Sequence, residues 1–389
     1  MTPEAPPLLA ETDLGAVRHN ARVLAELAAP AALMGVVKAD AYGHGAVPVA
    51  KALVEDGVGH LAVAHVAEAA ELREAGIEAP ILVFGAPVAE ALPAYARLGL
   101  GVTVSSREVA LAVVEAARAH GPLEAHVKVD TGMHRLGVAP ADAADVLAAL
   151  HDAPGVSVAA LWTHLATADG DLAFADEQLA RFASLVDALG PLAPEAESGA
   201  PAVHVANGPL LLRRPEAAAR PGSLVRVGGV LYGLASSADL QPALDAAGLR
   251  SALRVTTRVV HLQTVPAGES VSYGQTWRAP ADRRVATLAA GYADGLPRAL
   301  SPAGRVGIGG RLVPIVGRVC MDMLMVDLGP PDAPEASGVA LGDEAVLWGR
   351  GGPSVREQAE AAGTIAYELT CGLAARVTRS VRAASGDAG

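Results

Sequence analysis

The stretch LMGVVKADAYGHG, residues 33–45, leads from a short apolar run into a glycine-rich turn, and Lys38 stands at the junction. Seven further apolar runs follow it: HLAVAHV (60–66), PILVFG (80–85), LGVTVS (100–105), AHVKVD (125–130), VSVAALWTH (156–164), AVHVAN (202–207) and LVRVGGVLYG (224–233). Ala/Glu/Leu-rich stretches with helical spacing separate the runs, as at 106–120 and 176–189. Eight alternating strand–helix units over roughly 220 residues predict a (β/α)8 barrel, to which we assign residues 1–244.

Local signals within this region support the helices but leave one alternative open. Ser106, with Glu108 in the first turn, is a good helix start, and Asp13 precedes an amphipathic stretch at 14–28. The small-residue segment 191–201 is expected to be a loop inside the first domain. An open, doubly wound sheet would give the same alternation, although no run is followed by the GxGxxG turn of dinucleotide-binding sheets.

The pattern changes after about residue 244. Alternating segments broken by Gly and Pro occupy most of the remaining chain, and helical spacing returns only at 354–375. We therefore expect a mostly β C-terminal domain at 245–389, with 236–251 as the junction. The alternating segments are VTTRVVHLQTV (255–265), RRVATLAAG (283–291), RLVPIVGRVCMDMLMVDLG (311–329) and EAVLWG (344–349).

Composition limits the classes of function. The 389 residues carry a formal net charge of −12, which argues against nucleic acid or an anionic membrane as the main partner. No apolar run approaches the length of a membrane span, and the first residues lack a secretory pattern. The two cysteines, Cys320 and Cys371, have no metal-ligand spacing, so we expect no metal site and a cytoplasmic protein with reduced thiols.

Lys38 is unusual because 27 of the 30 basic residues are arginines. A primary amine can lose its proton and condense with a carbonyl, whereas a guanidinium cannot. Such an amine forms a Schiff base with pyridoxal 5′-phosphate (PLP). In a barrel, side chains at the carboxyl ends of the strands meet at one rim. The other groups expected at this rim are Tyr42, Phe84, Lys128, Asp130, His164, Asn207, Gly208, Arg226 and Tyr232.

Taken together, the motifs closely resemble the alanine racemase family. They occur in the family's order and span both domains: VVKADAYGHG (36–45), VKVDTGMHRLG (127–137), WTHLATAD (162–169), HVANG (204–208), VRVGGVLYGL (225–234), VSYGQTW (271–277), GYADG (291–295), GRVCMDMLMVDL (317–328) and AYELTCGLAARVTR (366–379). The resemblance implies a PLP-dependent isomerase that interconverts L-alanine and D-alanine by two-base proton exchange. Such an enzyme supplies D-alanine for bacterial peptidoglycan.

The resemblance also assigns the cofactor contacts. Lys38 would carry the Schiff base, His164 would lie against the pyridine ring, and Arg226 would face the ring nitrogen. The phosphate would be held by Tyr42, Tyr367, Asn207, Gly208, Gly228 and Gly229. Two positions depart from the family: it often has serine at 208 and commonly a larger apolar residue at 229. For each glycine, an ordinary turn stays an alternative.

A second acid–base group is needed because racemisation moves a proton between opposite faces of the substrate. The resemblance implies Lys38 on one face and, on the other, Tyr273 from the partner subunit of a homodimer, activated through His164 by the charge of Arg226. Met321 of the partner would contact the substrate carboxylate. Arg135 would steer that carboxylate, and Lys128 matches a lysine that is carbamylated in many members. An unmodified Lys128 paired with Asp130 or another acid is the alternative.

Three other functions stay open. A serine or broad-specificity racemase of the same family would differ by a few residues at the mouth of the site. A barrel-type PLP decarboxylase would share the lysine but pair the ring nitrogen with a carboxylate, which Arg226 disfavours. A non-enzymatic PLP-binding protein resembles the barrel alone, which the β domain disfavours.

Overall fold

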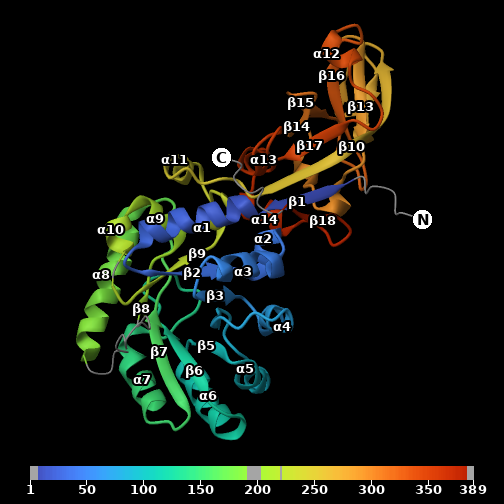
Figure 1. Cartoon of the computed structure of the whole chain (residues 1–389). Helices are drawn as coiled ribbons and strands as arrows, with labels where there is room; N and C mark the ends of the chain where they lie inside the picture. Colours follow the sequence, from blue (N-terminus) through green and yellow to red (C-terminus); the bar gives the residue numbers. More distant parts are fainter. Residues whose placement is uncertain (1–7, 191–202, 220, 383–389) are drawn as a thin grey trace, which may run out of the picture.

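The computed structural model describes residues 8–190, 203–219 and 221–382, and it divides into a barrel and a β domain (Figure 1). The barrel sheet is parallel, in the order β8-β7-β6-β5-β4-β3-β2-β9, and isolated bridges Val203–Ser223 and Asn207–Arg226 join its two edges. The predicted (β/α)8 barrel is therefore confirmed and the open sheet is excluded. Its strands are β2 (Ala32–Val36), β3 (His60–Val63), β4 (Ile81–Val83), β5 (Leu100–Val104), β6 (Leu123–Lys128), β7 (Val156–Trp162), β8 (Val203–His204) and β9 (Leu224–Val227).

Helices cover the outside of the barrel, and side-chain caps set where several of them begin. Asp13 accepts a hydrogen bond from the Ala16 N–H at 3.1 Å, and Ser106 accepts one from Val109 at 3.2 Å. The helices are α1 (Leu14–Ala28), α2 (Lys38–Gly43), α3 (Ala46–Glu55), α4 (Val66–Glu74), α5 (Leu92–Leu98), α6 (Arg107–His120), α7 (Ala143–His151), α8 (Leu172–Leu189), α9 (Gly208–Arg213), α10 (Pro215–Ala218) and α11 (Gln241–Ala246). The predicted loop at 191–201 lies outside the described residues.

The second domain is mostly β, as predicted. Its main sheet has the order β13-β16-β15-β14-β17-β10-β1-β18, with β13 also paired to β10. The strands are β1 (Leu9–Asp13), β10 (Leu253–Val265), β13 (Arg283–Leu288), β14 (Arg305–Ile308), β15 (Arg311–Val316), β16 (Leu324–Gly329), β17 (Glu344–Trp348) and β18 (Thr378–Arg382). A two-stranded ribbon, β11 (Ser270–Val271) and β12 (Trp277–Arg278), packs against this sheet through Val271 and Trp277. Three short helices complete the domain: α12 (Pro334–Ser337), α13 (Val355–Ala362) and α14 (Ala366–Cys371).

Strand β1 belongs to the second domain although it begins the described chain. It pairs antiparallel with β10 and parallel with β18, whereas the sequence-based division places residues 1–244 in the barrel. Asp13 both ends β1 and caps α1, so the chain passes directly from one domain into the other. The two domains are thus connected at two points, residues 13–14 and the segment from α11 to β10 (Figure 1).

Seven short 3₁₀ segments are found in the described residues. Two of them, η4 and η6, carry residues predicted for the site. They are η1 (Ala89–Ala91), η2 (Pro140–Asp142), η4 (Gly229–Tyr232), η5 (Ala238–Leu240), η6 (Tyr273–Gln275), η7 (Tyr292–Asp294) and η8 (Arg298–Leu300). None of the helices in the described residues combines the length and apolar character that crossing a membrane requires.

Candidate active site

A cavity of about 700 Å³ lies at the carboxyl ends of the barrel strands. Most of the residues predicted for the site line it: Lys38, Tyr42, Lys128, Arg135, His164, Asn207, Gly208, Arg226, Gly228, Gly229 and Tyr367. They come from segments up to 329 residues apart, and barrel closure brings them together. Tyr273 and Met321 are not among the lining residues.

Lys38 is followed by a strained turn. Ala39, Asp40, Ala41 and Tyr42 all have φ between +51° and +54°, so α2 contains a left-handed turn of four non-glycine residues. Left-handed helical backbone costs roughly 1–2 kcal/mol per residue, so neighbouring contacts must hold this conformation. The Asp40 carboxylate provides one such contact, because it accepts the Ala46 N–H at 2.7 Å.

Glu68 provides the second contact, and the sequence analysis missed it. Its Oε1 accepts the N–H of Ala39 at 2.6 Å, next to Lys38, and its Oε2 accepts the N–H of Ala64 at 2.7 Å. One carboxylate therefore ties the turn after β2 to the end of β3. In the sequence, Glu68 is an ordinary glutamate in the first turn of α4, and no neighbouring residue marks it as a site residue.

The environment of Lys38 favours the neutral amine. Burial is the main cause that lowers the pKa of Lys38, and the charge of Arg135 lowers it further. No ion pair to Lys38 is found within the described residues, and its Nζ lies 5.9 Å from the centre of the Tyr42 ring. An amine held this way loses its proton more readily than an exposed lysine.

The absence of a side chain at two glycines makes room for two tyrosine hydroxyl groups at the cavity. A Cβ atom at Gly228 would lie 2.5 Å from the Tyr42 Oη, and one at Gly229 would lie 2.2 Å from the Tyr367 Oη. The Tyr42 and Tyr367 rings meet edge to face, with centroids 5.3 Å apart. Burial raises the pKa of Tyr367 to about 12 and that of Tyr42 further, so both phenols are neutral hydrogen-bond donors.

The glycine at 208 also has a steric partner. A Cβ there would lie 2.3 Å from Cγ2 of Val230, which is buried. Asn207 accepts the N–H of Leu210 at 3.0 Å and so caps α9. Gly208 and Gly229 are the first residues of α9 and η4, so their N–H groups have no partner within those helices.

Arg226 is a buried arginine paired with oxygen and nitrogen acceptors. It donates to the carbonyl oxygen of Thr163 at 2.8 Å and to that of Val205 at 3.1 Å. It also donates to His164 Nδ1 at 3.2 Å. Burial lowers the pKa of Arg226 to about 9, so the guanidinium is still protonated at neutral pH.

A row of histidines continues from Arg226 through the barrel. Arg226 donates to His204 Nδ1 at 3.2 Å, and His204 Nε2 lies 3.2 Å from His126 Nδ1. His126 Nε2 lies 2.9 Å from Glu124, whose side chain is half exposed. Because an arginine can only donate, each imidazole carries its hydrogen on Nε2 and the row runs in one direction, from Arg226 to Glu124.

Lys128 is fully buried and does not pair with Asp130. Its Nζ donates to the carbonyl oxygen of Leu136 at 2.6 Å and lies 5.1 Å from the centre of the Trp162 ring. Asp130 instead accepts backbone N–H groups of Gly132 and Met133, each at 2.9 Å. Burial is the main cause that lowers the pKa of Lys128 to about 8. The structure therefore contains no ion pair between Lys128 and Asp130.

Three more cavity residues escaped the sequence analysis. Ser236 donates to Asp169 at 2.6 Å, and both line the cavity near Tyr367. Cys371, for which the sequence indicated only a reduced thiol, is exposed at the cavity. A side chain's place on a cavity wall depends on loop paths that periodicity does not describe, so no sequence signal marked these residues.

Tyr273 and Met321 lie on the surface of the β domain. Their exposed fractions are 71% and 53%, values unusual for residues of their size. Tyr273 follows Ser272, which has φ +67° and donates to the carbonyl oxygen of Arg318 at 2.8 Å. Within one chain these two side chains do not complete the cavity. Among the described residues, no three His, Cys, Asp or Glu side chains are grouped so as to hold a metal ion.

Comparison with known proteins gives the family. Residues 12–236 match the alanine racemase N-terminal domain, and residues 252–381 match the alanine racemase C-terminal domain. Alanine racemase of Mycobacterium tuberculosis is 41% identical over 398 residues, 99% of each chain, and that of Chlorobaculum tepidum is 40% identical over 374 residues, 95% of this chain and 94% of the relative.

Solved structures agree with the sequence comparison. The biosynthetic alanine racemase of Pseudomonas aeruginosa superposes with a TM-score of 0.85 at 38% identity, covering 97% of this chain and 100% of that one. Alanine racemase of D-cycloserine-producing Streptomyces lavendulae gives a TM-score of 0.88 at 37% identity, covering 97% and 98%. With both domain models matched in order and full-length relatives at this identity, the chain belongs to the alanine racemase family of isomerases.

Proposed function

We propose that this isomerase interconverts L-alanine and D-alanine with PLP as cofactor, moving the α-hydrogen between Lys38 and Tyr273 of a second copy. The observation that carries the proposal is the convergence of Lys38, Arg226 and the Tyr42–Gly228 and Tyr367–Gly229 pairs in one cavity. The cytoplasmic location and the supply of D-alanine to peptidoglycan stay predictions from the sequence.

The residues of the cavity fit PLP. Gly228 and Gly229 leave bare backbone beside two neutral phenols, and a side chain at either glycine would displace a tyrosine. With the N–H groups of Gly208 and Gly229, these phenols form a set of neutral donors suited to a phosphate. Lys38 would hold the aldehyde carbon, and Arg226 would face the ring nitrogen.

PLP supplies an electron sink for negative charge at the substrate α-carbon. The chain supplies the rest. Arg226 keeps its proton at neutral pH, so it cannot protonate the ring nitrogen of PLP. An unprotonated ring nitrogen would withdraw less negative charge from the α-carbon. This would favour return of the proton over transamination or decarboxylation. Burial lowers the pKa of Lys38, which raises the fraction of neutral amine able to accept a proton.

Tyr273 supports a site completed by a second copy of the chain. It is exposed on the β domain, and other exposed apolar side chains of that domain, Tyr292, Met321, Met323 and Ile365, provide a surface for association. We propose a homodimer in which Tyr273 and Met321 of each copy enter the other's cavity. Each protomer alone would then lack one of the two acid–base groups.

Arg135 and Lys128 are proposed to act on the substrate side. Arg135 is exposed at the cavity, free to meet a carboxylate. Lys128 is a buried amine with a pKa of about 8, so a sizeable fraction is neutral near that pH and can react with carbon dioxide. The resulting carbamate would carry a negative charge toward Arg135.

The competing functions predict different products. Incubating the PLP-loaded protein with each alanine enantiomer in deuterated water tests them together: a racemase labels and interconverts both, a decarboxylase releases carbon dioxide, and a binding protein does neither. Borohydride reduction followed by peptide mass spectrometry should place the pyridoxyl group on Lys38. A label on another peptide would overturn the proposal. Running the same assay with serine measures how broad the specificity is.

A further inference from the structure

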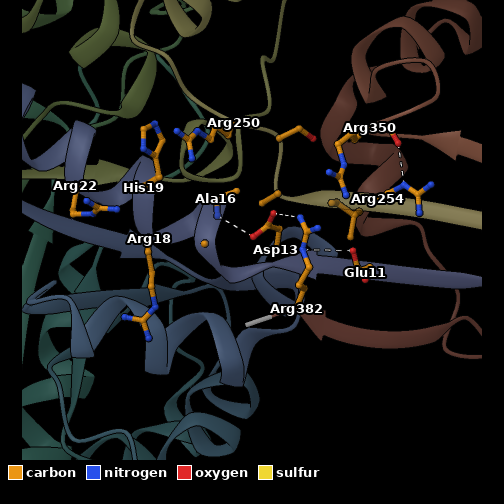
Figure 2. A pocket seen from close by; sticks show the side chains of 14 residues that line it. Glu11, Asp13, Ala16, Arg18, His19, Arg22, Arg250, Arg254, Arg350 and Arg382 are labelled. Carbon is orange, nitrogen blue, oxygen red and sulfur yellow. Dashed lines mark hydrogen bonds and ion pairs between the residues drawn. The ribbon is translucent and has the colours of Figure 1, made fainter. Parts of the chain in front are cut away.

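A second cavity, of about 570 Å³, lies between α1 and the β domain (Figure 2). We propose that it binds a small phosphorylated anion with at least two negative charges, such as pyrophosphate or a nucleoside diphosphate. Its lining carries six arginines against two carboxylates, and we call it the arginine cleft. The arginines are Arg18, Arg22, Arg250, Arg254, Arg350 and Arg382, and the carboxylates are Glu11 and Asp13.

The concentration of positive charge is not a product of overall composition. The chain has a net charge of −12, yet six of its 27 arginines meet at this one cleft. They arrive from four places in the sequence: α1, the start of β10 with the segment before it, the end of β17 and the end of β18. Only the docking of the two domains brings them together, as Figure 2 shows.

Three of the arginines are already neutralised. Arg18 pairs with Glu55 and Asp56, on the barrel side. Arg254 pairs with Glu344. Arg382 pairs with Asp13 and, at 3.8 Å, with Glu11, which accounts for both carboxylates of the lining. These pairs hold the walls of the cleft and leave none of its acids unpaired.

The other three, Arg22, Arg250 and Arg350, have no side-chain hydrogen bond or ion pair within the described residues. All three are exposed. One lies on α1, one before β10 and one after β17, so the unpaired guanidinium groups surround the cleft from both domains. Both carboxylates of the lining pair with Arg382, so none is left to neutralise these three arginines. In a protein of net negative charge, such a group of unpaired arginines indicates a binding site for an anion.

One further feature favours an anion there. Gly15, in the first turn of the 15-residue helix α1, lines the cleft, so the positive end of that helix faces it, with the Asp13 carboxylate already accepting the N–H of Ala16. His19 at the wall adds no donor of this kind, because its Nε2–H is used on the carbonyl oxygen of Gly248 at 3.0 Å and Nδ1 of the neutral ring is an acceptor. The site thus combines unpaired guanidinium groups with the positive end of a helix.

Phosphate is the chemistry that best matches these donors. A guanidinium presents parallel N–H groups that bind phosphate oxygens in pairs, and three such groups require a ligand with several charges. A single alanine carboxylate has too little charge, so the cleft is not a second substrate site. The volume suits a ligand from pyrophosphate to a nucleotide.

Binding would bridge the two domains, because Arg22 belongs to the barrel and Arg350 to the β domain. The test is titration of the holoenzyme with pyrophosphate at constant ionic strength, followed by calorimetry and by the thermal midpoint. We expect saturable binding and a rise in the midpoint. The triple variant Arg22→Gln/Arg250→Gln/Arg350→Gln should bind about tenfold or more weakly.

The matched control is Arg97→Gln/Arg107→Gln/Arg118→Gln. It removes the same charge from exposed arginines outside the cleft and should bind pyrophosphate like the parent. Equal weakening in both triple variants, or no saturable binding by the parent, would overturn the proposal. ADP separates the sources: affinity equal to pyrophosphate indicates an inorganic ligand, and tighter binding indicates a nucleotide. Citrate binding as tightly as pyrophosphate would refute the phosphate assignment.

Discussion

Arg226 donates a hydrogen bond to His164 Nδ1 across 3.2 Å inside the barrel. Because a guanidinium has no acceptor, His164 must be neutral at Nδ1 and carry its hydrogen on Nε2. Burial, followed by the charge of Arg226, holds the pKa of His164 well below its usual range. The pair therefore presents a neutral imidazole backed by a fixed positive charge, and its Nε2–H would be a donor for the phenol that we propose Tyr273 supplies.

Replacing Arg226 with lysine should be strongly destabilising although it keeps the charge. An ammonium cannot reach the carbonyl oxygens of Thr163 and Val205 together with His164, and buried acceptors without donors cost about 1–3 kcal/mol each. We expect a loss of about 3 kcal/mol or more in the free energy of unfolding, measured with urea. Arg107→Lys, at an exposed position, is the control. A variant as stable as the control would contradict this role.

Acid should destabilise the fold through its buried histidines. Burial lowers the pKa of His44 to about 4 and those of His164 and His204 well below 6.5. His44 donates through Nδ1 to Ala41 and Tyr42, while its buried Nε2 has no partner among the described residues. A histidine whose folded pKa is lowered stabilises the protein above pH 6.5 and loses that contribution as pH falls toward the folded pKa.

For His44 the contribution amounts to about 3 kcal/mol. Urea unfolding at intervals from pH 7.5 to 4.5 measures the slope of stability against pH. His44→Gln should reduce this slope by up to about 1.4 kcal/mol per pH unit, whereas His120→Gln, at an exposed position, should leave it unchanged. An identical slope in both variants would show that the pKa of His44 does not differ between the folded and unfolded states.

Glu68→Gln should loosen the turn that carries Lys38. The amide nitrogen that replaces one carboxylate oxygen cannot accept an N–H, so either Ala39 or Ala64 loses its partner. We expect a loss of about 1.5–3 kcal/mol in stability and weaker retention of PLP on dialysis. Glu71→Gln, on the same helix and exposed, is the matched control. If Glu68→Gln retained PLP as well as the control, the conformation of the turn would not contribute to cofactor binding.

Gly208→Ser and Val230→Ala should be energetically coupled. The serine Cβ would lie 2.3 Å from Val230, so Gly208→Ser alone should lower stability and PLP affinity by overpacking, about 1–3 kcal/mol in stability. Adding Val230→Ala opens the space, and the double variant should recover most of the loss. A double-mutant cycle on the thermal midpoint and on the PLP dissociation constant measures the coupling. Simple additivity would contradict the steric explanation.

Tyr273→Phe should separate the two proton transfers. If Lys38 serves one face and Tyr273 the other, the variant should still exchange the α-hydrogen of one alanine enantiomer in deuterated water, but not that of the other, and racemisation should fall by about 100-fold or more. Tyr95→Phe removes a phenol hydroxyl outside the cavity and is the control. Equal, mild loss of exchange with both enantiomers would exclude Tyr273 as a base.

The strands of the barrel were predictable because parallel strands buried on both faces appear as continuous apolar runs. All eight runs became strands, from Ala32–Val36 to Leu224–Val227. Strand β1 was not predicted, since its partners β10 and β18 come about 240 and 370 residues later. Pairing over that distance leaves no local pattern.

Within the site, the reactive residues were identifiable from chemistry and family resemblance, but their supports were not. Lys38 and Arg226 lie in recognisable stretches, whereas Glu68, Ser236 and Asp169 act through contacts with segments distant in the sequence. The sequence around a helical glutamate is the same whether its carboxylate faces solvent or accepts hydrogen bonds from a strained turn.

The amino-acid sequence by itself determined the alternation of strands and helices, the change to a β domain and the placement of a reactive amine at a strand end. These are local properties, set by the period of apolar residues and by residue chemistry. Tertiary structure alone decided that Tyr273 faces outward, that Arg226 meets His164, and that three unpaired arginines meet between the domains. Those relationships depend on how distant segments pack, because electrostatics and hydrogen bonds act through space and not along the chain.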